Sequence, residues 1–449
     1  MQTKKPVIII GAGLGGIFMA LCLAKRGYKV SIYERFSQER LTEEASNRSF
    51  NLTFYARGIQ ALKKAGLWNL IQPQLWSLKG SAAYFPYGTV YTEFDTTENP
   101  QYVIERPAFL QLLLQEAIKQ PNISFHFDTQ LISVDRNART ITTKKAKTDQ
   151  LQTVACDIVI GADGINSVVR PFIQNGRNTS HKQEFLPWTY KQVKIPAHLA
   201  AELGWKERTE NFVHAEDALL LSFPNVDGSF TAMFLLPENA TYRFAALTNE
   251  KLLKQFLQKT FPNLAPAHDV FIQSFLSNPE GRLSTITTQP WYYKDFLVLI
   301  GDSAHGLLPF YGQGTAAAFE DCLTIVSLLD AKEGVWRDIF PLYQAKRKPN
   351  TDLLAYFSKE SFDRLMRYKQ ADIQAIKSKF DAILNSMFPK LWLPPIYNMI
   401  ADDASDFQEI LAKHAKRQKL ARWLGITAGA YGIYAALLLK EKLSSITKK

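Results

Sequence analysis

Short apolar runs, separated by glycine turns and amphipathic stretches, open the chain. Val7–Ile10 and Val30–Glu34 contain the first two runs, and the residues between them begin with glycines and carry an apolar helical stripe as far as about Arg26. Short apolar runs between glycine turns are typical of buried strands, whereas the longer periodic stretch is typical of a helix. The pattern therefore predicts a strand–helix–strand unit over residues 5–34.

Further along the chain the pattern predicts more strands and then a change in character. We expect a helix over residues 107–119, strands at 123–127, 131–134 and 154–160, and a polar hairpin-like section near 136–152. Between about 180 and 290 alternating strands with turn residues predict a sheet, and from 341 onward the chain is mainly helical. Together these elements predict an α/β protein with a doubly wound Rossmann-like domain, a β-sheet domain and a helical C-terminal region.

The doubly wound domain is expected to be discontinuous, because sheet segments interrupt it twice. Its three parts are expected at 1–75, 107–180 and 291–345, and the sheet segments at 76–106 and 181–290. A helical region at 346–422 and an apolar helix at 423–439 follow.

Composition narrows the class of protein. With 449 residues, 46% of them apolar and 21% charged, the chain resembles an ordinary globular protein. The net charge is +11, but basic residues are dispersed except near the C-terminus and no nucleic-acid-binding module is recognisable, so we expect no nucleic-acid partner. Cys22, Cys156 and Cys322 lie far apart in apolar surroundings. This spacing predicts buried thiols, no metal site and a reducing, cytoplasmic compartment.

The stretch 423–439 contains no charged residue and has basic residues on both sides. As a helix it would be about 25 Å long, near the lower limit for crossing a bilayer. Its Trp and Tyr residues suit a membrane interface. We expect it to attach the protein to a membrane; a helix packed on the protein or in a dimer seam is the alternative, and the oligomeric state is left open.

The glycines after the first strand form the sequence Gly11-Ala-Gly13-Leu-Gly-Gly16. Glycines at this spacing allow a tight turn, close approach of the backbone to a pyrophosphate, and close packing of the helix on the strand. Glu34, at the end of the second strand, is where a carboxylate binds a ribose hydroxyl in such units. The strand, the glycines, the helix and the acidic residue in register predict a dinucleotide site.

A second motif follows the buried strand at 154–160, where Asp163-Gly164 forms a turn before a short predicted helix. Ser167 and Arg170 stand three residues apart and would share one face of that helix. Taken alone, the motif favours a simpler interpretation, in which Asp163 caps the helix and Arg170 lies on the surface.

The most specific motif covers residues 301–314 and follows a buried apolar strand. Asp302 lies at the strand end, Pro309 stiffens the loop, and the last glycines open a helix predicted over residues 315–329. The free N–H groups and the dipole of that helix N-terminus stabilise negative charge, such as reduced flavin carries. The motif therefore predicts a flavin, and His305 is expected to order the turn and not to act as a base.

Together the three motifs resemble those of the class A flavoprotein aromatic hydroxylases, of the para-hydroxybenzoate hydroxylase type. The resemblance implies FAD as cofactor and NADPH as co-substrate, without a second glycine fingerprint for NADPH. It implies cofactor contacts, from the adenosine end to the flavin ring, at Gly11, Gly13, Leu14, Gly15, Gly16, Glu34, Arg35, Arg106, Asp163, Asp302, Gly312, Gln313 and Gly314. Pro309, Gly312 and Gln313 would border the chamber where oxygen is activated, and no metal is implied.

A longer resemblance, to the kynurenine 3-monooxygenase family, covers nearly the whole chain. It rests on ordered segments that include Asn47-Arg48-Ser-Phe-Asn51-Leu, Arg57-Gly-Ile-Gln-Ala-Leu62, Tyr190-Lys191, Phe223-Pro-Asn225 with Ser229-Phe-Thr231, Phe261-Pro262 and Pro395-Ile-Tyr397-Asn-Met399. It implies an FAD-dependent, NADPH-consuming monooxygenase that hydroxylates an aromatic substrate with O2 through a C4a-hydroperoxyflavin. The alternatives are a related enzyme for another aromatic or polyketide-like substrate, and a membrane-attached flavin oxidoreductase that does not hydroxylate.

The departures from that family concern the substrate. The family binds an amino-acid carboxylate with an arginine and a tyrosine from the sheet, and with an asparagine and a tyrosine from the C-terminal region. Tyr397 matches the last of these, whereas Phe94 stands near the place of the first tyrosine and Ser361 near that of the asparagine. The segment with Lys79 and Ser81 lacks the arginine, and a lysine offers a carboxylate only a point charge. We expect these five residues around the substrate and leave kynurenine itself open.

Overall fold

A computed structural model describes residues 4–47, 51–94, 96–97, 99–176, 179–366, 396, 399–400 and 407–423 of the chain. The protein divides into two compact units, residues 1–361 and residues 362–449. The first unit holds the three motifs described above and the sheets that position them.

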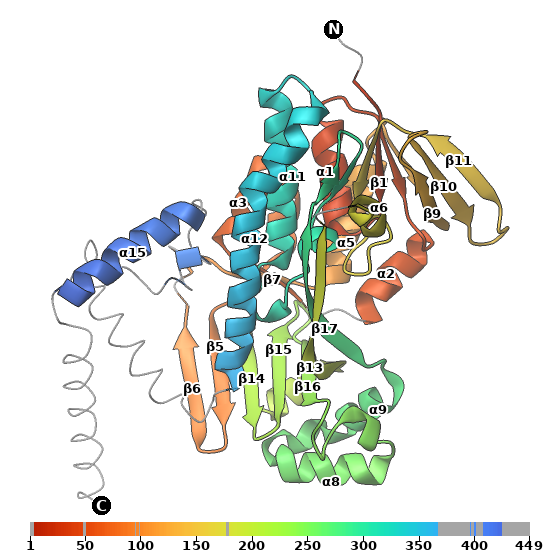
Figure 1. Cartoon of the computed structure of the whole chain (residues 1–449). Coiled ribbons are helices and arrows are strands. Elements are labelled where there is room, and N and C mark those ends of the chain that lie inside the picture. Colours follow the sequence, from red (N-terminus) through yellow and green to blue (C-terminus); the bar gives the residue numbers. More distant parts are fainter. Residues whose placement is uncertain are drawn as a thin grey trace, which may run out of the picture. The chain divides into compact units, whose positions relative to one another are not determined.

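A six-stranded sheet forms the centre of the first unit, with the strand order β18-β19-β12-β1-β2-β8. Its strands are β1 (Val7–Ile10), β2 (Val30–Tyr33), β8 (Ile123–His126), β12 (Ile158–Gly161), β18 (Tyr292–Tyr293) and β19 (Leu297–Leu299). Neighbouring strands are parallel except β18 and β19. The chain crosses to both sides of the central β1, which confirms the doubly wound domain (Figure 1).

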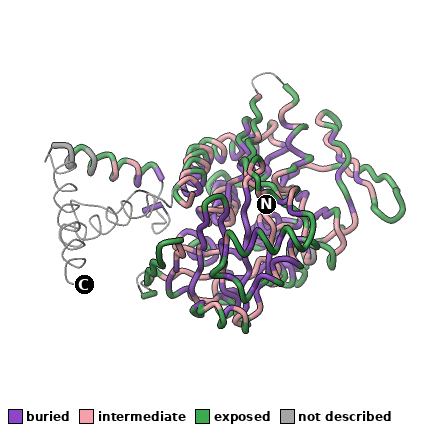
Figure 2. Tube along the Cα trace, turned by 90° about the horizontal axis from the view of Figure 1, so that it is seen from below, coloured by how far each residue is buried: buried purple, intermediate pink, exposed green. Residues whose placement is uncertain are grey.

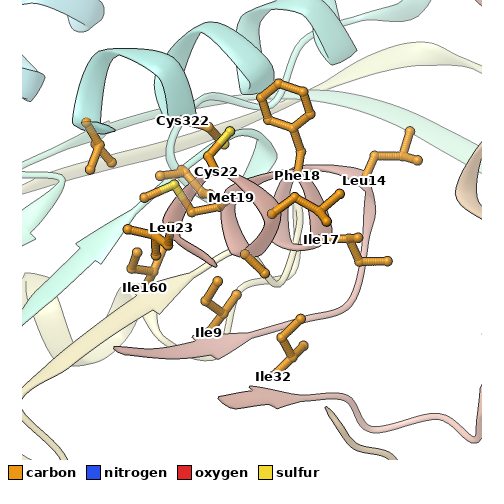
Figure 3. Close-up of a cluster of buried hydrophobic side chains, with 14 of the residues drawn as sticks. Ile9, Leu14, Ile17, Phe18, Met19, Cys22, Leu23, Ile32, Ile160 and Cys322 are labelled. Carbon is orange, nitrogen blue, oxygen red and sulfur yellow. The ribbon is translucent and has the colours of Figure 1, made fainter. Parts of the chain in front are cut away.

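Helix α1 (Leu14–Ala24) is apolar around its whole circumference because both of its sides are covered. Ile9, Ile32 and Ile160 of the sheet lie beneath it, and Cys322 of α11 (Gly314–Ala331) lies above it (Figure 3). The rings of Phe18 in α1 and Phe319 in α11 stack, with 3.9 Å between their centroids. Helix α5 (Arg106–Ile118) adds to the same core and ends one residue from its expected bounds.

The other elements around this sheet are short. The helices are α2 (Gln38–Asn47), α3 (Ala56–Lys64), α4 (Trp68–Ile71), η1 (Gln72–Gln74) and α6 (Arg170–Gln174). One small sheet contains β3 (Leu52–Phe54), β4 (Trp76–Ser77) and β7 (Tyr102–Ile104), and another contains β9 (Thr129–Asp135), β10 (Thr140–Lys145) and β11 (Leu151–Ala155). The polar section near 136–152 thus belongs to an antiparallel sheet of three strands.

A seven-stranded sheet with the order β17-β13-β16-β15-β14-β5-β6 confirms the β-sheet domain. Its strands are β5 (Gly80–Phe85), β6 (Gly88–Glu93), β13 (Ser180–Ile195), β14 (Thr209–Ala215), β15 (Ala218–Pro224), β16 (Phe230–Pro237) and β17 (Gly281–Gln289). One face packs on α8 (Glu250–Thr260) and α9 (His268–Ser277) (Figure 1). In this layer the ring of Phe234 meets four other phenylalanine rings. Shorter elements, α7 (Ala197–Glu202), η2 (Phe244–Ala246) and η3 (Pro262–Ala267), complete this layer.

The chain then returns to the first domain through α10 (Asp302–His305), η4 (Pro309–Tyr311) and α11, and continues into the long helix α12 (Trp336–Met366). One side of α12 is buried through Leu354, Phe357, Ser358 and Ser361. The ring of Phe357 lies 6.0 Å from that of Tyr311. Buried residues run through the interior of the first unit, and exposed residues lie at its periphery (Figure 2).

In the second unit the structure describes α15 (Phe407–Trp423). The apolar stretch 424–439, on which the expected membrane attachment depends, lies outside the described residues. Among the helices within the described ranges, none combines the length and the apolar character that crossing a bilayer requires.

Candidate active site

The glycine loop after β1 is packed so closely that two of its positions accept only glycine. Gly11 has φ +103°, and a Cβ there would lie 2.6 Å from the carbonyl oxygen of Ala162. A Cβ on Gly16 would lie 2.1 Å from the carbonyl oxygen of Gly11. In contrast, nothing in the described structure lies within 4 Å of a Cβ built on Gly13. The loop therefore presents bare, open backbone at Gly13, as binding of a pyrophosphate requires.

Glu34 follows β2 directly, and its buried carboxylate holds the glycine loop. Oε2 accepts a hydrogen bond from the N–H of Ala12 at 2.8 Å, and Oε1 accepts one from the N–H of Phe36 at 3.0 Å. Each oxygen keeps a further lone pair, so the carboxylate can also accept a hydrogen bond from a ribose hydroxyl. Arg35 is exposed, and its guanidinium lies 4.6 Å from the ring centre of Phe36.

The glycine loop and the first turns of α11 meet. Leu14 is buried, and a Cβ on Gly15 would lie 3.6 Å from the Cβ of Ala318. The Sγ of Cys322 approaches the carbonyl oxygen of Gly15 at 3.5 Å. The first and third motifs therefore belong to one site, although about 300 residues separate them in sequence.

Asp163 follows β12, and its side chain closes the turn before α6. Oδ2 accepts hydrogen bonds from the N–H groups of Val168 at 2.7 Å and Val169 at 3.1 Å. Burial raises the pKa of the carboxyl, and these hydrogen bonds oppose the rise. Oδ1 has no hydrogen-bond partner within the described residues. Both N–H groups precede α6, whose N-cap is Val169, so Asp163 closes the turn and does not cap the helix, and its Oδ1 can accept a hydrogen bond from a ligand.

Two expectations for Arg170, the shared helical face and the surface position, are wrong. Helix α6 begins at Arg170, so Ser167 precedes the helix, and its Oγ accepts the N–H of Arg170 at 3.1 Å. The Arg170 side chain is buried, with its Nε donating to the carbonyl of Ser303 at 2.9 Å and its Nη2 to that of Ile165 at 2.8 Å. The hydroxyl of Ser303 in turn donates to the carbonyl of Gly161 at 2.6 Å. Arg170 thus joins the second motif to the third.

Asp302 opens α10 after Gly301, which has φ +58°. Asp302 is an exposed residue. Neighbouring protein groups nevertheless reduce the hydration of its carboxyl, and this desolvation raises the pKa of the carboxyl. The positive charge of Arg106, at the start of α5, opposes that rise, and so does His305. Asp302 and Arg106 therefore share one electrostatic environment, and the open carboxylate can accept hydrogen bonds from hydroxyl groups.

The loop from Pro309 to Gly314, called the flavin loop below, depends on a left-handed glycine. Gly312 has φ +64°, and a Cβ there would lie 2.5 Å from the Oγ1 of Thr53. The adjacent Gln313 is 2% exposed, and neither atom of its amide has a hydrogen-bond partner among the described residues. Gly314 begins α11 with nothing within 4 Å of its Cβ position. A buried free amide beside an open helix N-terminus fits a ring edge that offers both donors and acceptors, as a flavin does.

A buried charge network lies next to these motifs. The fully buried carboxylate of Asp321 in α11 accepts hydrogen bonds from the N–H of Gly301 at 2.9 Å and the Nε of Arg347 at 2.8 Å. The Nε2 of His305 lies 2.5 Å from the same carboxylate. Burial alone would raise the pKa of Asp321, but His305 and Arg347 outweigh it and lower the pKa to about 2. His305 is therefore fixed by an ion-paired carboxylate, which fits the ordering role expected for it.

Arg347 also connects Asp321 to a second carboxylate. Its Nη1 donates to Glu320 at 2.7 Å, and the other oxygen of Glu320 accepts from Arg57 at 2.8 Å. Sequence reasoning missed this network, although Glu320 and Asp321 are adjacent charges within an apolar helical stripe. In the sequence, this interruption of the apolar stripe is what indicates that the two carboxylates have buried partners.

A buried amide pair joins the flavin-loop region to the seven-stranded sheet. The Nδ2 of Asn51, just before β3, donates to the Oδ1 of Asn225 at 2.7 Å and to the carbonyl of Pro224 at 3.2 Å. Thr53, two residues after Asn51, is the residue that crowds Gly312. The pair therefore joins the end of β15 to the segment that leads into β3, and Thr53 of β3 lies against Gly312 of the flavin loop.

Three of the residues expected around the substrate lie together. Ser81 is half-buried on β5, and Lys79, two residues earlier, is exposed. Phe94 is half-buried after β6, and its N–H donates to the carbonyl of Lys79 at 3.0 Å. Ser361 comes from a different element, the buried side of α12, and Tyr397 lies outside the described residues.

Cys22 and Cys322 are buried and Cys156 is half-buried, and all three thiols are free. Burial raises the pKa of Cys22 to about 12 and that of Cys156 to about 11, so the thiol forms predominate. Across the described ranges, no three His, Cys, Asp or Glu side chains gather as metal ligands would.

Comparison with known proteins agrees with this geometry. Residues 4–354 match the family model described as FAD binding domain. A kynurenine 3-monooxygenase of Salinispora tropica is 30% identical and covers 97% of this chain and 96% of its own. One of Legionella pneumophila is 35% identical and covers 80% of each chain. The solved structure of 2-methyl-3-hydroxypyridine-5-carboxylic acid oxygenase shares the fold, with a TM-score of 0.64 at 17% identity over 81% of this chain and 92% of that one.

The chain therefore belongs to the FAD-binding family of flavin monooxygenases. It is an FAD-dependent enzyme that uses NADPH and O2 to hydroxylate an aromatic substrate. Curated relatives that match most of its length include several kynurenine 3-monooxygenases, which confirms both the flavin predicted from residues 301–314 and the family resemblance.

Proposed function

We propose that the enzyme hydroxylates an electron-rich aromatic ring of the kynurenine type, an amino-substituted phenyl ketone. The observation that carries the proposal is the 30–35% identity to kynurenine 3-monooxygenases over at least 80% of the chain. The geometry supports it, because the Asn51–Asn225 pair joins the sheet that carries Ser81 to the segment before β3, and Thr53 of β3 lies against the flavin loop. A substrate site that both elements border would hold a ring close to the reactive edge of the cofactor.

The residues of the three motifs would hold FAD from one end to the other. In this proposal Gly11, Gly13, Leu14, Gly15 and Gly16, together with Glu34 and Arg35, bind the adenosine diphosphate part, while Asp163 and Arg106 lie near the phosphates and NADPH. Asp302 accepts hydrogen bonds from the ribityl hydroxyls, and Gly312, Gln313 and Gly314 meet the ring. When bound, FAD accepts a hydride from NADPH and activates O2 for transfer of one oxygen atom to the ring.

The protein's own part is to orient the reactants, hold charge and exclude water. The N-terminus of α11 stabilises negative charge through its free N–H groups and its dipole. Pro309 contributes no N–H and has a fixed φ, so it stiffens the flavin loop. Lys79, Ser81, Phe94, Ser361 and Tyr397 are proposed as substrate contacts.

Gln313→Leu tests the role assigned to the free amide. A leucine removes a buried polar group that lacks a partner, so the thermal midpoint of the FAD-free protein is expected to stay constant or to rise. The dissociation constant for FAD is expected to increase roughly tenfold, because one or two hydrogen bonds to the ring are lost. Fluorescence titration with FAD measures this, and Gln130→Leu, at an exposed position of β9, is the control. Equal FAD affinity in both variants would refute the contact.

Kynurenine is the first substrate to test. The FAD-loaded enzyme is expected to consume NADPH faster when an amino-substituted phenyl ketone is present and to release a ring-hydroxylated product in matching amount. Chromatography with mass detection measures the product, and a peroxide assay measures the uncoupled fraction. NADPH consumption that yields only hydrogen peroxide with every such compound would contradict the proposal and favour the oxidoreductase that does not hydroxylate.

A further inference from the structure

Alternate residues of β14 point to opposite faces of the seven-stranded sheet. Val213 and Ala215 belong to the core that the sheet forms with α8 and α9. Glu210, Phe212 and His214 therefore point to the other face. Glu210 is the acidic residue at the start of this row, and no motif of the sequence includes it.

Ser81 lies directly across from Glu210 on the neighbouring strand. β5 and β14 are parallel, and their register pairs these two residues. Further along the same face, the rings of Phe85 and His214 stack with 4.8 Å between their centroids. Ser81 belongs to the segment that lacks the arginine of the kynurenine 3-monooxygenase family. A carboxyl group thus stands beside the place where a cation was expected.

This end of β14 is also the end of the sheet that is tied to the flavin loop. β15 runs antiparallel to β14, with Asn211 opposite Ser222. Glu210 therefore lies beside the last residues of β15, and Asn225 follows that strand directly. Because Asn225 binds Asn51, the position of Glu210 and the flavin loop are connected at the same end of the sheet.

The carboxyl of Glu210 is buried without a partner in the described part of the chain. The residue is 7% exposed, and none of the described groups donates a hydrogen bond to it or pairs with its charge. Burial raises its pKa to about 8. A carboxyl removed from water is unfavourable unless a donor or an opposite charge meets it. A ligand that brings a cationic donor would meet this need.

We propose that Glu210 is a specificity-determining residue that receives the amine or ammonium group of the aromatic substrate. The inference rests on the proposed function, since it assigns the polar end of the same substrate. An ammonium group supplies charge-assisted hydrogen bonds to the carboxylate and shifts Glu210 toward its ionised form. A substrate carboxylate in the same place would bring no cation and would oppose ionisation of Glu210, so the site favours amines over amino acids.

Two ring-matched substrates test the proposal. Kynurenine carries both a carboxylate and an ammonium group, and kynuramine is the amine that results when kynurenine loses its carboxylate. The wild-type enzyme is expected to have a kcat/KM for kynuramine at least roughly tenfold above that for kynurenine. Glu210→Leu is expected to lower kcat/KM for kynuramine by about tenfold or more, mainly through KM, and to remove the preference. Glu210→Gln, which keeps the shape and loses the charge, should act in the same direction.

A merely structural role predicts a different pattern, in which both substrates lose activity equally. A preference that stays within twofold of wild type in both Glu210 variants would overturn the proposal. Bound FAD and the thermal midpoint show that the variants fold, and Glu207→Leu, exposed just before β14, is the control expected to keep the preference. If the wild type hydroxylates neither compound, the proposed function fails as well. If it hydroxylates both with a preference independent of Glu210, this inference alone fails.

Discussion

Arg347→Met is expected to lower the free energy of unfolding by about 3–5 kcal/mol, because it leaves buried carboxylates without their cation. The Arg347 side chain is 5% exposed and pairs with Asp321 at 2.8 Å and with Glu320 at 2.7 Å. Without it, Asp321 loses its guanidinium partner and keeps His305 and the N–H of Gly301 among its described partners. Urea unfolding followed by circular dichroism measures the loss.

Arg26→Met is the matched control for that substitution. Arg26 donates to Asp330 from two nitrogens, at 2.8 and 2.6 Å, whereas Arg347 donates to Asp321 from one. The control therefore removes at least as many hydrogen bonds to an aspartate. Both side chains are partly exposed, at 31% and 56%, and solvent screens the pair, so we expect a loss of about 0–1 kcal/mol. A loss for Arg347→Met no greater than that for Arg26→Met would contradict the stabilising role of the buried network.

Gly13→Ala is expected to leave the fold intact and to weaken FAD binding by about ten- to a hundredfold. Its φ of −71° and ψ of 178° suit alanine, and nothing in the described structure lies within 4 Å of the added Cβ. The methyl group would instead occupy the space through which a pyrophosphate approaches the backbone, where crowding costs about 1–3 kcal/mol. Equilibrium titration with FAD and the thermal midpoint of the FAD-free protein measure the two effects separately.

Gly176→Ala is the control, because Gly176 also has open space around its Cβ position but lies in an exposed turn outside the site. It should change neither FAD affinity nor the thermal midpoint. Wild-type affinity in Gly13→Ala would show that the cofactor does not pass over this residue, and the dinucleotide assignment of the glycine loop would fall. A large drop in the thermal midpoint would mean that the loop is less open than described.

Features that depend on local backbone geometry could be predicted from the sequence. Gly11 is required by its φ of +103° and Gly16 by its approach to the carbonyl of Gly11, so the spacing of the two glycines carries the signal; the contact of Gly11 with Ala162 adds a distant reason that the spacing does not show. Gly312 could also be predicted, because it has a left-handed φ and lies just before the predicted helix, where glycine is favoured. Short apolar runs likewise predicted the parallel sheet, because buried parallel strands are apolar on both faces.

Features that depend on distant partners could not be predicted. Arg170 lies 133 residues from Ser303, and Arg347 lies 26 residues from Asp321. The identity of one charged residue does not indicate which distant residue it binds. The position of Arg170 was also misjudged because α6 begins later than the pattern suggested. Glu210 could not be identified as a site residue from the sequence, because its burial follows from strand pairing, which places it opposite Ser81.

The most direct test of the central claim, that this enzyme transfers oxygen from O2 to an aromatic ring, is isotopic. The FAD-loaded enzyme is supplied with NADPH, ¹⁸O2 and the better of the two substrates, and the product is analysed by mass spectrometry. We predict one ¹⁸O atom in each hydroxylated product and none when ¹⁸O is supplied as water. A product without ¹⁸O from O2, or NADPH oxidation that produces only peroxide, would contradict the claim.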